Sequence, residues 1–90
     1  MNVLKQIRKN IDNNLYNTDK TKSFRSDLMT LASKEYNIEG ELFDYLYAFA
    51  SEYVLANSYI NKHSDVLDKF IELLNLAERI IFYYEGGHYE

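Results

Sequence analysis

The chain has 90 residues, which is enough for one domain and too few for two. Hydrophobic residues make up 47% and charged residues 27%, a balance that excludes a disordered chain, and 14 acids against 10 bases give a net charge of −4. The absence of cysteine excludes disulfides and thiolate metal sites, and the absence of proline with only three glycines argues against a hairpin-rich β fold.

The first two segments with apolar residues at spacings of three and four predict amphipathic helices over about residues 2–16 and 22–36. The first stripe consists of Leu4, Ile7, Ile11 and Leu15, and the second of Phe24, Leu28, Leu31, Ala32 and Tyr36. We expect Asn37 to end the second helix in the left-handed conformation, with Ile38 as the hydrophobic contact just beyond it.

The third segment, about residues 39–60, is the most apolar part of the chain. Its main row is Leu42, Leu46, Phe49, Tyr53, Ala56 and Ile60, and a second row of Phe43, Tyr47, Ala50 and Val54 lies beside it. Tyr45, Ala48, Leu55 and Tyr59 occupy much of the remaining circumference. A helix that is apolar nearly all round is either central in its bundle or covered by a partner.

The fourth predicted helix covers about residues 64–85, with Ser64 as its N-cap, and Gly86-Gly87 ends it before a tail of residues 86–90. Its main seam consists of Leu67, Phe70, Leu74, Ala77, Ile81 and Tyr84. The short link after the third helix predicts that the third and fourth helices form a long antiparallel hairpin. The sequence therefore predicts one all-α domain over residues 1–90, a compact antiparallel bundle of about four helices.

Charge is distributed unevenly along the chain. Residues 1–34 hold seven bases and three acids, a net charge of +4, whereas residues 35–90 hold three bases and eleven acids, a net charge of −8. Such an asymmetry either lets the two halves attract each other within the fold or orients a charged partner. A net charge of +4 over 34 residues is thin for a strong nucleic-acid binder.

One stretch resembles the helix-turn-helix of bacterial repressors: Leu31-Ala32, Tyr36-Asn37-Ile38, Leu42 and Tyr45. Tyr36 stands at the position of the turn glycine in that motif, and the aliphatic Ile38 comes one residue late. The segment in the place of the recognition helix begins with Glu39, Glu41 and Asp44, whose carboxylates would be repelled by phosphates. A DNA-binding regulator is therefore an alternative interpretation, and we expect no nucleic-acid partner.

The sequence contains no recognisable catalytic, cofactor or metal site. His63, in the link before the fourth helix, and His88, in the tail, are the only histidines, and zinc needs three or four converging ligands. No glycine-rich phosphate loop is present, and Glu52 is the one acid set among apolar neighbours, where burial could raise its pKa. We expect no enzyme, no cofactor and no metal.

Nine tyrosines in 90 residues are the most unusual feature of the composition. Tyrosine fills cores with its hydroxyl at the surface, and it is also enriched at interface hot spots. The apolar run at residues 80–84 surrounds the last helical turns, so part of it must face away from one bundle core. The predicted protein-binding residues are Tyr45, Tyr47, Tyr59, Phe82, Tyr83 and Tyr89.

These features lead to the hypothesis of a small, non-enzymatic protein-binding domain, an inhibitor or accessory protein that masks a protein partner, possibly a second copy of itself. A bacteriocin immunity protein is an alternative, because such proteins are small antiparallel four-helix bundles. The richness in Asn, Lys, Ile and Tyr is typical of a low-GC bacterium, its phage or a plasmid. No signal peptide and no transmembrane run are apparent, so we expect a cytoplasmic location.

Overall fold

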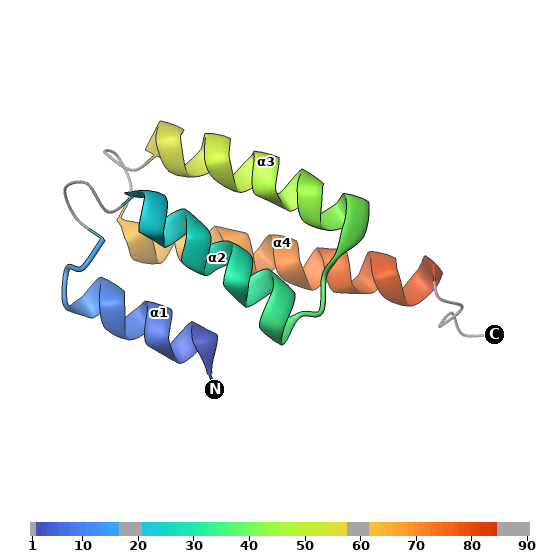
Figure 1. The fold of residues 1–90 in the computed structure, drawn as a ribbon, viewed down its shortest axis with the longest axis horizontal. Helices are drawn as coiled ribbons and strands as arrows, with labels where there is room; N and C mark the ends of the chain where they lie inside the picture. Colours follow the sequence, from blue (N-terminus) through green and yellow to red (C-terminus); the bar gives the residue numbers. More distant parts are fainter. Residues whose placement is uncertain (1, 17–20, 58–61, 85–90) are drawn as a thin grey trace.

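The computed structural model describes residues 2–16, 21–57 and 62–84. Within these residues it contains four α-helices, α1 Val3–Asp12, α2 Thr21–Glu35, α3 Gly40–Asn57 and α4 His63–Tyr84, and no strand. Successive helices run in opposite directions side by side (Figure 1). α1 contacts α2 and α4, and α3 contacts α2 and α4, so the helices form a closed ring. The predicted all-α antiparallel bundle of four helices is confirmed.

Two helices are central in the bundle, α2 and α4, because each contacts the other three. The predicted stripe of α2 is fully buried at Phe24, Leu28, Leu31 and Ala32. The most apolar helix, α3, is therefore not a central one, and it lies at the edge of the bundle against α2 and α4. This position leaves the outer circumference of α3 uncovered by the other described helices.

α1 is shorter than the sequence predicts, because the chain turns after Asp12. Asn14 takes a left-handed φ of 57°, and the Leu15 N–H donates to the Asn10 carbonyl at 2.9 Å. The turn rotates Leu15 out of the predicted stripe, so that 52% of its surface is exposed, and it buries Tyr16 instead. The phenol of Tyr16 then accepts a hydrogen bond from Asn10 and donates one to Asp27 on α2.

The corner between α2 and α3 follows the sequence prediction. Asn37 has a left-handed φ of 53°, and the Ile38 N–H donates to the Ala32 carbonyl at 3.1 Å. Ile38 is buried, which supplies the hydrophobic contact that commonly accompanies such a helix end. Gly40, with a φ of 70°, then begins α3. These few residues turn the chain back along α2.

Two predicted rows on α3 and α4 differ from the structure. On α3 the fully buried residues are Leu46, Ala50 and Val54, so most of the core contact comes from the row that the sequence ranked second. On α4 the seam is buried from Leu67 through Ala77, but Tyr84 at its end is 87% exposed because α4 projects past the other helices (Figure 1).

α4 also begins one residue earlier than predicted. The helix starts at His63, and the Lys62 carbonyl accepts hydrogen bonds from the N–H groups of Asp65 and Val66. Ser64 is therefore the second residue of the helix and not its N-cap. His63, which the sequence placed in a link, is consequently fixed in the helix and packs against the core.

Candidate functional site

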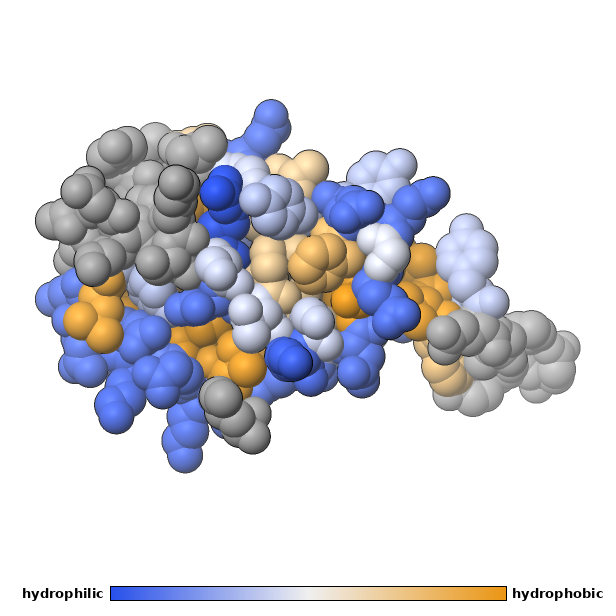
Figure 2. Space-filling model, viewed as in Figure 1, coloured by the Kyte–Doolittle hydropathy of each residue, from blue (hydrophilic) through white to orange (hydrophobic). Residues whose placement is uncertain are grey.

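Exposed hydrophobic side chains gather on α3 and on the C-terminal half of α4. Among the described residues the large ones are Tyr45, Tyr47 and Phe49 on α3, and Leu76, Ile80, Phe82, Tyr83 and Tyr84 on α4, with Leu15 alone elsewhere. Figure 2 shows hydrophobic surface in orange over the end of α4 that projects from the bundle. Monomeric proteins seldom leave such patches without a role in binding.

A first groove lies between the start of α3 and the end of α4. It has a volume of about 470 Å³ and is lined by Glu41, Leu42 and Tyr45 of α3 and by Ile80, Ile81 and Tyr84 of α4. Tyr45 is 70% exposed at its rim. The antiparallel pairing of the two helices brings these residues together, although they are far apart in the sequence.

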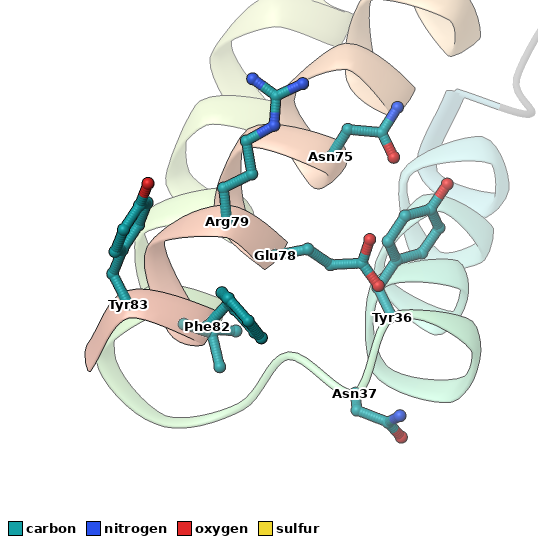
Figure 3. A pocket seen from close by; sticks show the side chains of 8 residues that line it. Tyr36, Asn37, Asn75, Glu78, Arg79, Phe82 and Tyr83 are labelled. Carbon is teal, nitrogen blue, oxygen red and sulfur yellow. The ribbon is translucent and has the colours of Figure 1, made fainter. Parts of the chain in front are cut away.

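A second groove, of about 760 Å³, lies on the other side of the last turns of α4 (Figure 3). Its walls are Tyr36 and Asn37 from the α2–α3 corner and Asn75, Glu78, Arg79, Ile81, Phe82 and Tyr83 from α4. The Glu78 carboxylate points toward the Tyr36 ring (Figure 3). Burial and then the nearby Glu78 charge raise the pKa of the Tyr36 phenol. The Phe82 and Tyr83 rings meet edge to face, with 6.3 Å between the ring centres.

Tyr47 belongs to a different surface from the other predicted tyrosines. It lies on the side of α3 that faces α2, where the Arg25 guanidinium sits 5.5 Å from the centre of its ring. Arg25 also donates a hydrogen bond of 3.2 Å to the Ser51 hydroxyl. The exposed ring of Tyr47 is thus engaged within the chain, which makes it a weaker candidate for a partner contact than Tyr45.

The structure exposes three predicted binding residues, Tyr45, Phe82 and Tyr83, at the end of the bundle where α4 projects. Tyr59 and Tyr89 lie outside the described residues. Sequence reasoning missed Leu76, Ile80 and Tyr84, which it treated as unremarkable or as part of the core. Leu76 and Ile80 lead at a constant four-residue spacing to Tyr84, the last residue of the predicted seam, and this second row is the signal that could have found them.

His63 occupies an aromatic pocket at the start of α4. Its ring meets the Phe24 ring edge-on at 4.8 Å and the Tyr16 ring at 5.7 Å. Its Nε2 atom is buried and has no hydrogen-bond partner, and burial lowers the pKa of the imidazole. The other histidine, His88, lies outside the described residues. This packing between two aromatic rings gives His63 a structural role.

Among the residues that the structure describes, no acidic side chain is buried in the way that favours general acid chemistry. Glu52 is exposed, contrary to the expectation that its apolar neighbours would enclose it. Across residues 2–16, 21–57 and 62–84, no three histidine or acid side chains come close enough to hold a metal ion.

Comparison with protein-family models, with curated proteins and with solved structures returned no match to this chain. None of the helices in the described ranges combines the length and the apolar character needed to cross a membrane. By its fold, this chain belongs to the class of small four-helix bundles.

Proposed function

We propose that this chain is a small non-enzymatic protein-binding domain that inhibits or assists a protein partner by covering part of its surface. The observation that supports the proposal is the aromatic end of the bundle, where Tyr45, Phe82, Tyr83 and Tyr84 are all exposed. Aromatic side chains carry most of the binding energy at many interfaces, because they bury a large area and lose little conformational entropy.

The position of these residues also favours binding. They lie on helices, whose backbones hold the side chains in place, and they line two grooves that share Ile81. A partner that fills either groove would desolvate aromatic surface that already has a fixed shape, so little ordering would oppose association. The proposal envisages a cytoplasmic protein of a low-GC bacterium, phage or plasmid, and a homodimer is the simplest alternative to a foreign partner.

The exposed carboxylates near this end argue against the DNA-binding alternative. Glu39, Glu41 and Asp44 are all exposed where a recognition helix would approach phosphates. In addition, α3 packs lengthwise beside α2 rather than projecting from it (Figure 1). The immunity-protein alternative shares the bundle architecture, and no residue of the surface favours it over another kind of masking protein.

The proposal is tested by replacing Phe82 and Tyr83 with aspartate in one variant. We expect capture of the partner from a lysate of the encoding cell, or dimerisation measured by light scattering, to be lost while the helical circular dichroism stays unchanged. Leu15→Asp is the control, because Leu15 is a hydrophobic residue of comparable exposure that lies far along the chain, outside both grooves. Binding that survives in the double variant, or that is lost equally in the control, would contradict the proposal.

A further inference from the structure

Two rows of hydrophobic side chains run side by side on the face that α3 and α4 share. On α3 the row is Tyr45, Phe49 and Tyr53, and on α4 it is Leu76, Ile80 and Tyr84, each at four-residue intervals. The first groove joins the rows, because Tyr45 lines it together with Ile80 and Tyr84. Since the helices are antiparallel with equal rise, this pairing places Phe49 at the level of Leu76.

The rows are preformed rather than collapsed into the core. Leu76 is 51% exposed, and Phe49 and Ile80 also remain exposed beside it. The Phe49 and Tyr53 rings stack on each other at 5.3 Å, which holds them in a fixed arrangement along the helix. Each row spans two helical turns, or roughly 12 Å, which matches the footprint of about two turns of a third helix laid along the face.

The charge around this face is negative and is not balanced from within α3. That helix carries Glu41, Asp44 and Glu52, all exposed, and no lysine, arginine or histidine. Glu41 lines the groove itself. On α4 the nearby Lys69 is already paired with Glu72, at 3.5 Å. The α3 side of the rim therefore presents carboxylates to whatever covers the hydrophobic rows.

This charge pattern discriminates between two kinds of occupant. A symmetric dimer through this face would bring the same patch of each copy together, and thus carboxylates of α3 against carboxylates of α3. Like charges facing each other across an interface are unfavourable, whereas lysine or arginine at the rim would form ion pairs and could stack on Tyr45. The face fits a partner with a basic flank toward α3 better than it fits a second copy.

We infer that the α3–α4 face binds an amphipathic helix of a protein partner, with large apolar residues along one side and lysine or arginine on the flank that meets α3. The inference rests on the proposed function and adds the location and the chemical class of the partner. The apolar side would lie between the two rows, and the basic flank would pair with Glu41 and Glu52, both of which are on α3. Binding of this kind weakens as salt concentration rises, because the rim charges are exposed to solvent.

The test uses two synthetic helical peptides of about 16 residues, roughly four turns, with identical apolar positions and either lysine and arginine or glutamate along one flank of the apolar side. Each is titrated into the full chain labelled with ¹⁵N and followed by NMR. We expect saturable shifts at Tyr45, Phe49 and Ile80 with the basic peptide and at least about tenfold weaker binding of the acidic one, the difference that about 1.4 kcal/mol produces.

Matched variants distinguish the effect of the rim carboxylates on peptide binding from the effect of the net charge of the chain. Glu41→Lys with Glu52→Lys is expected to weaken the basic peptide about tenfold or more, as for loss of a charge pair at an interface. Asp12→Lys with Asp68→Lys changes the net charge by the same amount and is the control, because neither acid lies on the α3–α4 face. Asp12 is on α1, and Asp68 is on the side of α4 that carries Asn75 and Arg79, which line the second groove. Tyr45→Ser tests the hydrophobic row without touching the core, and a melting curve of each variant verifies the fold.

The inference is overturned if neither peptide binds, or if both bind equally. It is also overturned if the variant with Glu41 and Glu52 replaced binds the basic peptide as the wild type does. Dimerisation of the chain that is abolished by Tyr45→Ser would likewise overturn it. The result separates from the proposed function. If the peptide fails while the Phe82 and Tyr83 variant loses its cellular partner, only this inference is wrong. If the peptide binds but the chain captures no protein at either groove, the proposed function is wrong.

Discussion

The carboxylate of Glu35, in the last turn of α2, accepts a hydrogen bond of 2.6 Å from the backbone N–H of Val3, the first residue of α1. The side chain of Asn2 caps the same end of α1 by accepting from the Lys5 N–H at 2.9 Å. A helix of 10 residues is marginal on its own. The contact from α2 therefore both satisfies an orphan donor of α1 and ties that helix to the centre of the bundle.

Replacing Glu35 with alanine should lower the free energy of unfolding by about 1–2 kcal/mol, the usual cost of losing a helix cap with a charged acceptor. Urea unfolding followed by circular dichroism measures the change. Glu39→Ala removes an exposed acid close by and should change stability by less than about 0.5 kcal/mol. Equal effects of the two substitutions would show that the contact with Val3 contributes nothing.

Replacing Tyr16 with phenylalanine should destabilise the fold by about 1–3 kcal/mol. The phenol donates to the half-buried Asp27 carboxylate and accepts from Asn10, so its loss leaves both groups without this partner. Tyr84→Phe, at an exposed position, should change stability by less than about 0.5 kcal/mol. A cost for Tyr16→Phe as small as that of Tyr84→Phe would contradict the structural role of the hydrogen bonds.

The Tyr16 phenol should also ionise after the exposed tyrosines in an alkaline titration. Burial and the hydrogen bond to Asp27 raise the pKa of Tyr16 well above its ordinary value of 10.0. Ultraviolet absorbance of tyrosinate measures this order, and Tyr16→Phe should remove the step at the highest pH. Because the folded state binds this proton more tightly than the unfolded state, stability should fall as pH rises above about 10.

Acid should weaken the fold through His63. Burial lowers the pKa of this histidine below its ordinary value of 6.5, so the unfolded chain binds the proton more readily than the folded chain. The stabilising contribution is complete above about pH 6.5 and is lost as pH falls below that value. Urea unfolding at about pH 7.5 and 5.5 brackets this window and avoids most carboxylate titration.

The matching variant for this pH dependence is His63→Leu, which keeps an apolar side chain between Tyr16 and Phe24. It should show a smaller loss of stability between the two pH values than the wild type does. His88→Gln removes the other histidine and should leave the loss unchanged. If His63→Leu and the wild type lose the same free energy on acidification, another group is responsible.

The left-handed turn at Asn37 predicts how two substitutions there and one control substitution affect the stability of the fold. Asn37→Gly should keep or slightly raise stability, whereas Asn37→Ala should lower it by about 1 kcal/mol, because a φ of 53° is strained for a side chain without a local polar group. Asn75→Ala, at an exposed helical position, serves as the control and should be neutral or stabilising. Thermal unfolding by calorimetry measures all three, and equal stability of the glycine and alanine variants would be inconsistent with the observed turn.

The sequence was most informative where hydrophobic period and turn chemistry agree. The spacing of Phe24, Leu28, Leu31 and Ala32 identifies the buried side of α2, and Asn37 with Ile38 identifies where that helix ends. It failed at the end of α1, because the apolar spacing carries the predicted helix through Leu15, whereas Asn14 adopts a left-handed conformation and turns Tyr16 inward. The geometry of this turn depends on the contact of Tyr16 with Asp27 across the bundle.

By itself the amino-acid sequence determined that the chain forms four helices, because the spacing of hydrophobic residues is a local property of consecutive residues. Tertiary structure decided which side of α3 is buried, since apolar residues surround that helix and only its contacts with α2 and α4 select Leu46, Ala50 and Val54. Tertiary structure likewise placed two tyrosines of α3 on different surfaces. Tyr47 lies under Arg25 of α2, and Tyr45 lies beside Ile80 of α4. Exposure depends on which neighbours arrive from elsewhere in the chain, and a periodic pattern carries no information about those neighbours.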